Sequence, residues 1–151
     1  MDVFVANEQP TPVDEVRASA LARHTLTSEN VEEGAELSLL FVGADHMRRL
    51  NARFAGNDRA TDVLAFPMTE DEDADLLLGD VVVCPEIAAK HAAKDGHPVA
   101  HELDVLVVHG ILHLLGYDHD KPDAKSKMDA RLREVLGSFA GLAGLSDEAN
   151  G

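Results

Sequence analysis

Residues 103–119 read LDVLVVHGILHLLGYDH, and this stretch contains three histidines, His109, His113 and His119. Because side chains four residues apart lie on the same face of an α-helix, His109 and His113 are expected to project side by side. Apart from Asp104 and the histidines, the run from Leu103 to Leu115 is apolar at nearly every position, which predicts a helix buried on most sides. The stretch therefore predicts a firmly held helix with two imidazoles on one face.

A third imidazole follows the predicted end of this helix. Gly116 stands where a helix needs a left-handed residue to terminate, and the chain can reverse after it so that His119 returns toward the other two. Three imidazoles can bind one divalent ion and leave a fourth position open. We therefore predict a metal site of His109, His113 and His119, with Zn²⁺ as the first expectation, although imidazole also suits nickel, copper and iron.

The spacing H-x-x-x-H-x-x-G-x-x-H matches the frame in which metzincin peptidases hold zinc. Those enzymes carry a glutamate after the first histidine as general base, whereas this chain has Gly110. The missing glutamate argues against peptidase chemistry. Three nitrogen ligands and an open position still favour a hydrolase, because such a site lowers the pKa of metal-bound water.

Two simpler interpretations of the histidines stay open. Histidines on apolar faces are often core residues with a hydrogen-bond partner. A structural metal site would need a fourth protein ligand, which Asp118, Asp120 or the only cysteine, Cys84, could supply.

Carboxylates near the third histidine are candidates for the proton transfer that Gly110 cannot perform. Asp118 and Asp120 flank His119, and each is a candidate for a base or for orienting an imidazole. Asp62 and Glu102 are more distant candidates. The other histidines lack metal spacing with one another and are interpreted as surface or core residues: His24, His46, His91, His97 and His101.

The chain resembles the YbeY family of bacterial single-strand-specific endoribonucleases. Three blocks carry the resemblance in the same order and at matching distances: TDVLAFP at 61–67, LGDVVVCPEIA at 78–88 and HGILHLLGYDH at 109–119. The resemblance covers roughly residues 37–136. It implies a zinc-type hydrolase fold, a metal held by the three histidines named above, and action on single-stranded 16S rRNA in maturation and ribosome quality control. It also implies small-subunit ribosomal proteins and assembly factors as partners.

The chain departs from this family where RNA is expected to bind. The family aromatic that corresponds to Phe54 is usually followed by an arginine assigned to RNA phosphate, but this chain has Ala55. We hypothesise that Arg53 or Arg59 supplies the missing guanidinium. Two further departures, Ala60 for proline and Ala65 for serine, do not touch the predicted metal ligands.

The charge of the chain opposes long-range attraction to RNA. With 13 Lys and Arg against 28 Asp and Glu, the formal net charge is −15, which repels a polyanion. Local phosphate contacts remain possible because nine basic residues fall in two segments, although a solvated face with ordinary ion pairs explains them equally well. These residues are Arg48, Arg49, Arg53 and Arg59, then Lys121, Lys125, Lys127, Arg131 and Arg133. The acidity also suits a saline cytoplasm or a basic protein partner.

Length and composition predict one domain. A chain of 151 residues that is 45% hydrophobic suffices for a single core, which we place at residues 1–140 with a flexible tail at 141–151. No apolar run reaches membrane length and the N-terminus lacks the features of a signal peptide, so we expect a cytoplasmic protein with no membrane association. A single cysteine excludes an internal disulfide, and Cys84 is expected to be buried at a strand end.

Hydrophobic periodicity and turn residues predict an α+β fold, an α/β sandwich of a mixed four-stranded sheet packed by about five helices. Strands are predicted at 3–5, 37–42, 61–66 and 76–83, and an acidic loop at 69–75. Helices are predicted at 12–27 with Pro12 in the first turn, 45–54 with Asp45 as its opening residue, 85–94, 100–115, and 123–136 ended by Gly137.

Three functions remain open from the sequence. The first is a metal-dependent endoribonuclease acting on single-stranded rRNA. The second is a non-enzymatic ribosome-assembly factor with a structural metal. The third is a metal hydrolase of a small substrate, for which a deep apolar cavity at the metal is expected.

Overall fold

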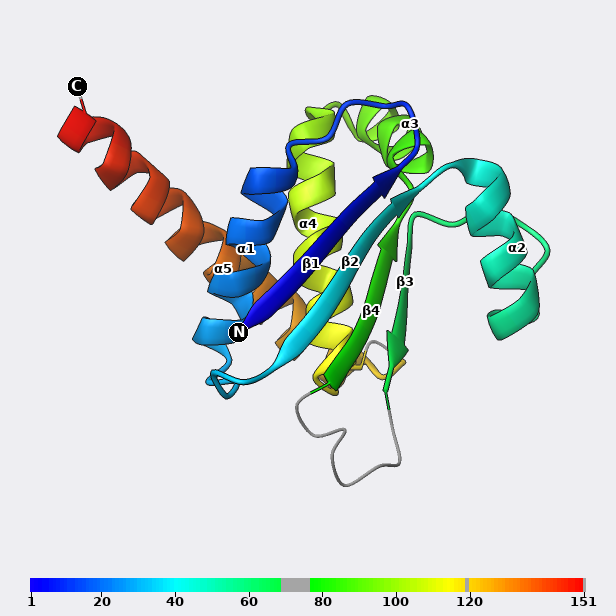
Figure 1. The fold of residues 1–151 in the computed structure, drawn as a ribbon, viewed down its shortest axis with the longest axis horizontal. Helices are drawn as coiled ribbons and strands as arrows, with labels where there is room; N and C mark the ends of the chain where they lie inside the picture. The colour runs from blue at the N-terminus through cyan, green and yellow to red at the C-terminus, as the bar shows by residue number, and fades with distance from the viewer. Residues whose placement is uncertain (69–76, 119, 151) are drawn as a thin grey trace.

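The computed structural model describes residues 1–68, 77–118 and 120–150 (Figure 1). The chain forms a four-stranded sheet in the order β1-β2-β4-β3. Strands β1 (Asp2–Glu8), β2 (Glu36–Val42) and β4 (Leu77–Val83) are parallel, and β3 (Val63–Pro67) runs antiparallel to β4 at the sheet edge. The predicted mixed four-stranded sheet is confirmed, and the predicted acidic loop at 69–75 lies outside the described residues.

Five helices accompany the sheet in the described part of the chain. They are α1 (Glu15–Ser28), α2 (Ala44–Ala55), α3 (Pro85–Asp95), α4 (Val99–Leu114) and α5 (Pro122–Asn150). Because successive strand residues point to opposite faces of the sheet, the apolar strand residues contribute to two hydrophobic cores, one on each face. The larger core joins one face of the sheet to α1, α4 and α5, and the smaller core joins the other face to α2. Figure 1 shows α4 behind the sheet, running roughly along the strands, and α2 on the side of β3.

Two predicted helix beginnings are wrong. Pro12 precedes α1, and Asp14 caps the helix by accepting a hydrogen bond from the Arg17 backbone N–H at 3.0 Å. The Asp14 side-chain oxygen satisfies a backbone donor of the first turn, whereas a proline side chain has no acceptor to offer. Gly43, rather than Asp45, is the cap residue of α2, and Asp45 lies in the first turn, where a negative charge suits the helix dipole.

The predicted end of the last helix at Gly137 is also wrong, because α5 continues to Asn150. A glycine inside a helix costs only about 1 kcal/mol, and apolar side chains on both sides of Gly137 offset that cost. Val135 is buried in the main core and Phe139 packs against it. In Figure 1 the C-terminal part of α5 extends away from the sheet. The flexibility of residues 141–151 stays a prediction.

Helix α4 is the centre of the molecule. It contacts α1, α3, α5, β3 and β4, and residues from Leu106 to Leu112 are mostly buried. This confirms the predicted buried helix. Among the described helices, none combines the length and apolar character required to cross a bilayer.

Candidate functional site

His109 and His113 line one pocket on α4. The pocket has a volume of about 220 Å³, and its other lining residues are Gly110 and the β3 residues Val63, Leu64 and Ala65. His109 is half-buried and His113 is exposed. The structure thus brings the first two predicted ligands to the same surface, one helical turn apart, beside the edge strand of the sheet.

Gly110 explains the departure from the metzincin frame in structural terms. A Cβ built at Gly110 would lie 2.5 Å from Cγ1 of Val81 and 3.3 Å from Cγ2 of Val63. Residue 110 therefore faces the sheet, where it lets α4 approach β3 and β4 closely. A glutamate at this position would point into the sheet, so its absence follows from packing.

The turn after α4 has the geometry predicted for it. Gly116 has a φ of +103°, its N–H donates to the His113 carbonyl at 3.1 Å, and the Tyr117 N–H donates to the Leu112 carbonyl at 3.1 Å. These two bonds form a Schellman motif that ends the helix. His119, the third predicted ligand, lies outside the described residues, so its place in the metal site stays a prediction.

Tyr117 ties this turn to two other helices. Its hydroxyl donates to Glu29 Oε2 at 3.1 Å, and Glu29 also pairs with Arg131 of α5. Arg131 in turn donates to the Ser28 carbonyl at 2.6 Å, at the end of α1. Burial raises the pKa of the Tyr117 hydroxyl, and the hydrogen bond to Glu29 raises it further.

Asp118 and Asp120, the candidate helper carboxylates, lie in the exposed turn beside the histidines. Asp118 Oδ1 accepts a hydrogen bond from the Asp120 backbone N–H at 3.0 Å. This contact shapes the turn, as aspartate side chains commonly do. Cys84, the other alternative ligand, is fully buried directly after β4, as predicted, and burial raises the pKa of its thiol.

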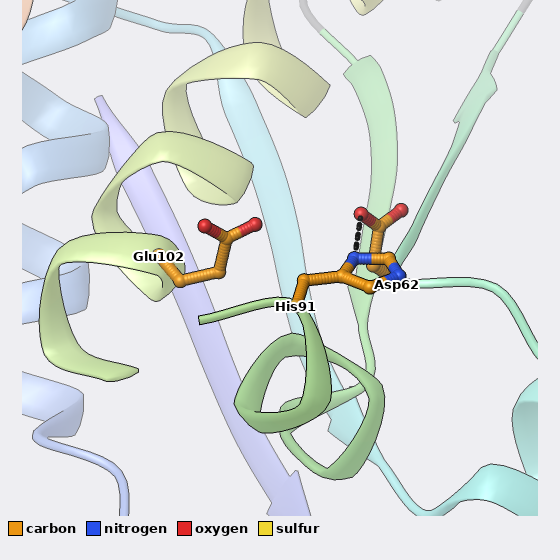
Figure 2. Close-up of side chains that lie close together, drawn as sticks. All are labelled: Asp62, His91 and Glu102. Carbon is orange, nitrogen blue, oxygen red and sulfur yellow. Dashed lines mark hydrogen bonds and ion pairs between the residues drawn. The ribbon is translucent and has the colours of Figure 1, made fainter. Parts of the chain in front are cut away.

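A second group of ligand-type side chains gathers near the beginning of α4. One ligand atom each from Asp62, His91 and Glu102 lies within 4.8 Å of the others, and Figure 2 shows the Glu102 carboxylate pointing toward the His91–Asp62 pair. His91 Nδ1 is 3.2 Å from Asp62 Oδ2. These residues could hold a divalent metal ion. His97 Nε2 also contacts Glu102 Oε2 at 2.5 Å, and Asp95, His97 and Glu102 form an overlapping group.

The sequence did not reveal this group. From the sequence, His91 is expected to be a surface or core residue, because it lacks metal spacing with the other histidines. The three residues come from the segment before β3, from α3 and from α4. Only the tertiary fold brings them together.

The two predicted RNA-contact arginines lie at the end of α2 and in the segment after it. Both are exposed, and the Arg53 guanidinium lies 5.2 Å from the centroid of the Phe54 ring. Among the described residues, the lining of the histidine pocket includes neither Arg53 nor Arg59. Two other members of the basic segments are held in ion pairs, Arg48 with Asp58 at 2.7 Å and Arg131 with Glu29.

The fold and this site define an α+β protein whose central helix presents two histidines beside the edge of a mixed sheet. The solution structure of TM1509 from Thermotoga maritima has the same fold, with a TM-score of 0.63, 29% identity and coverage of 92% of each chain. The model of the family described as Endoribonuclease YbeY matches residues 4–140.

Known sequences agree with this match. A Salinispora tropica protein named Endoribonuclease YbeY is 46% identical, and the match covers 92% of this chain and 96% of that protein. A protein of the same name from Parafrankia sp. is 45% identical, and the match covers 95% of this chain and 98% of that protein. The chain belongs to the YbeY endoribonuclease family, which confirms the resemblance seen in the sequence.

Proposed function

We propose that this protein is a metal-dependent endoribonuclease that cleaves single-stranded regions of rRNA, with one Zn²⁺ held by His109, His113 and His119. The observation that supports this proposal most directly is that His109 and His113 line the same pocket on one face of α4. Family membership supports the reaction class, because the relatives are named endoribonucleases.

The residues present fit such an ion. Two imidazoles one turn apart on a largely buried helix are a pre-positioned ligand pair, and the Schellman turn at Gly116 directs the chain back after them. A metal bound there would polarise a phosphoryl oxygen and lower the pKa of bound water. The protein's own contribution is to hold the imidazoles still and to leave the pocket open along the edge strand β3.

Proton transfer is assigned to the turn. Asp118 and Asp120 are the proposed helpers, as a base or as carboxylates that orient an imidazole. Both are exposed beside the helix end. Their exposure suits contact with substrate and solvent.

RNA binding is proposed to depend on local cations. Arg53 and Arg59 are proposed to contact phosphates, since the net charge of −15 disfavours attraction over long distances. The same acidity would complement basic ribosomal proteins, and we propose small-subunit proteins and assembly factors as partners in 16S rRNA maturation in the cytoplasm. Residues 1–140 are proposed to act as one domain.

Cleavage of a labelled single-stranded 16S rRNA fragment by the purified chain tests this proposal. We expect cleavage by the zinc-loaded protein, no cleavage after chelation, and loss of both cleavage and the ion at this pocket in His113→Ala. His101→Ala is a matched control, because His101 is an exposed imidazole on the same helix, and this variant should keep full activity. A zinc-loaded protein that leaves single-stranded RNA intact, or a His113→Ala variant that cleaves normally, would overturn the proposal.

A further inference from the structure

We propose that Asp62, His91 and Glu102 form a second divalent-metal site, separate from the histidine pocket, that binds a transition ion such as Zn²⁺ and joins three segments of the fold. The donor set is one imidazole and two carboxylates. Such mixed nitrogen and oxygen ligands are typical of zinc sites whose coordination is completed by water.

The spacing of the donor atoms suits one ion. Ligands about 2.0–2.2 Å from a tetrahedral zinc ion are about 3.3–3.6 Å apart. His91 Nδ1 and Asp62 Oδ2 are 3.2 Å apart, close to this separation, and the complete set lies within 4.8 Å. The His91 side chain is 48% exposed and that of Asp62 25% exposed, so small rotations of these side chains can draw the donors together.

Glu102 is the anchor of the proposed site. It is only 9% exposed. Because a glutamate this buried usually has a partner for its charge, the groups around its two carboxylate oxygens are informative. His97 contacts its Oε2, which leaves Oε1 as the oxygen that we assign to the metal. Outer hydrogen bonds of this kind commonly orient ligand carboxylates, so His97 is assigned as a positioning residue.

The proposed site is too far from the histidine pocket to form a two-metal centre with it. Glu102 precedes His109 by seven residues on α4, which corresponds to about 10 Å along the helix axis. Two-metal catalytic sites hold their ions about 3.5–4 Å apart. The second ion would therefore act on structure.

Its structural effect would reach the histidine pocket through β3. Asp62 directly precedes Val63, which lines that pocket, and the Asp62 carbonyl accepts a hydrogen bond from the Cys84 N–H at 2.9 Å. An ion shared by Asp62, His91 and Glu102 would fix the start of β3 against α3 and α4. Metal binding of this kind stabilises a fold because the unfolded chain lacks the assembled site.

Zinc stoichiometry and thermal unfolding test the proposal on the full chain. The chelator-stripped protein would be dialysed against excess Zn²⁺, freed of unbound ion and assayed for zinc by mass spectrometry. We expect two ions per chain in the wild type and one in His91→Ala, a change at a side chain that is 48% exposed. Asp62→Asn, which keeps the size of the side chain and removes its charge, should also bind one ion. His46→Ala, a change on α2, should keep two.

The variants separate this proposal from the proposed function. His113→Ala should lose the other ion and keep the one at His91, so that the double variant His91→Ala/His113→Ala binds none. Zinc should raise the unfolding temperature of His113→Ala but have little effect on the double variant. Equal zinc content in the wild type and His91→Ala would overturn the second site whatever His113→Ala shows. Equal zinc content in the wild type and His113→Ala would count instead against the metal of the proposed function.

Discussion

Gly110 and Val81 lie so close together that a Cβ on the glycine would be 2.5 Å from Cγ1 of the valine. This contact sets the distance between the histidine helix and the sheet. It links the glycine that directly follows His109 to the packing of the core, and it leads to a stability prediction.

Gly110→Ala is expected to lower the free energy of unfolding by about 1–3 kcal/mol, because the added methyl group must push α4 away from Val81. Urea denaturation followed by circular dichroism measures this change. Gly137→Ala is the matched control: Gly137 lies inside α5 with nothing within 4 Å of the added Cβ, so alanine should stabilise the chain by up to about 1 kcal/mol. Equal stability of Gly110→Ala and the wild type would contradict the close contact.

Tyr117 is the only tyrosine in a chain without tryptophan, so its ionisation can be followed directly by ultraviolet absorbance. Burial and the Glu29 hydrogen bond raise its pKa, and we expect a titration midpoint above the ordinary value of about 10. Glu29→Gln should lower this pKa, since it removes a nearby negative charge and leaves the positive charge of Arg131. A midpoint at the ordinary value in the folded wild type would show that Tyr117 is not held in this environment.

The raised pKa of Tyr117 also has a consequence for stability. The folded state favours the neutral phenol, so unfolding releases a proton once the pH exceeds the unfolded pKa of about 10. The contribution of Tyr117 to stability is therefore fully present below that pH and is lost as the pH rises from there through the raised pKa of the folded state. Tyr117→Phe should flatten this part of the stability profile, measured by urea denaturation between pH 8 and 11.

Cys84 should react slowly with thiol reagents in the folded protein. It is fully buried, and burial raises the pKa of its thiol, so both access and the thiolate fraction are reduced. Alkylation by iodoacetamide at pH 8 should be slow in buffer and fast in denaturing urea. Because the chain has a single cysteine, the labelled fraction reports this site alone, and equal rates in the two conditions would refute its burial.

Much of the fold follows from local patterns. The apolar run around His109, the left-handed position of Gly116 and the short apolar strands predicted α4, its end and the mixed sheet. These features depend on periodicity and backbone preference, which the sequence displays directly. The end of α5 could not be predicted, because Gly137 is a local signal that the packing of Val135 and Phe139 overrides.

The candidate site residues likewise fall into those that local spacing predicts and those that only the tertiary fold brings together. His109 and His113 were predictable because four-residue spacing on a helix is a local property. His91 was not, since its partners Asp62 and Glu102 lie in other elements. The packing role of Gly110 also depends on Val81, a contact across the fold that no motif contains.

The double variant Arg53→Ala/Arg59→Ala tests how an acidic protein holds RNA. If these residues contact RNA phosphates as proposed, KM for single-stranded RNA should rise several-fold in the double variant, and the dependence of binding on salt concentration should become shallower as phosphate contacts are lost. Arg48→Ala is the matched control on α2, because Asp58 already pairs with Arg48 at 2.7 Å, and it should change KM little. Cleavage and salt dependence that stay unchanged in the double variant would rule out both arginines as the substitute.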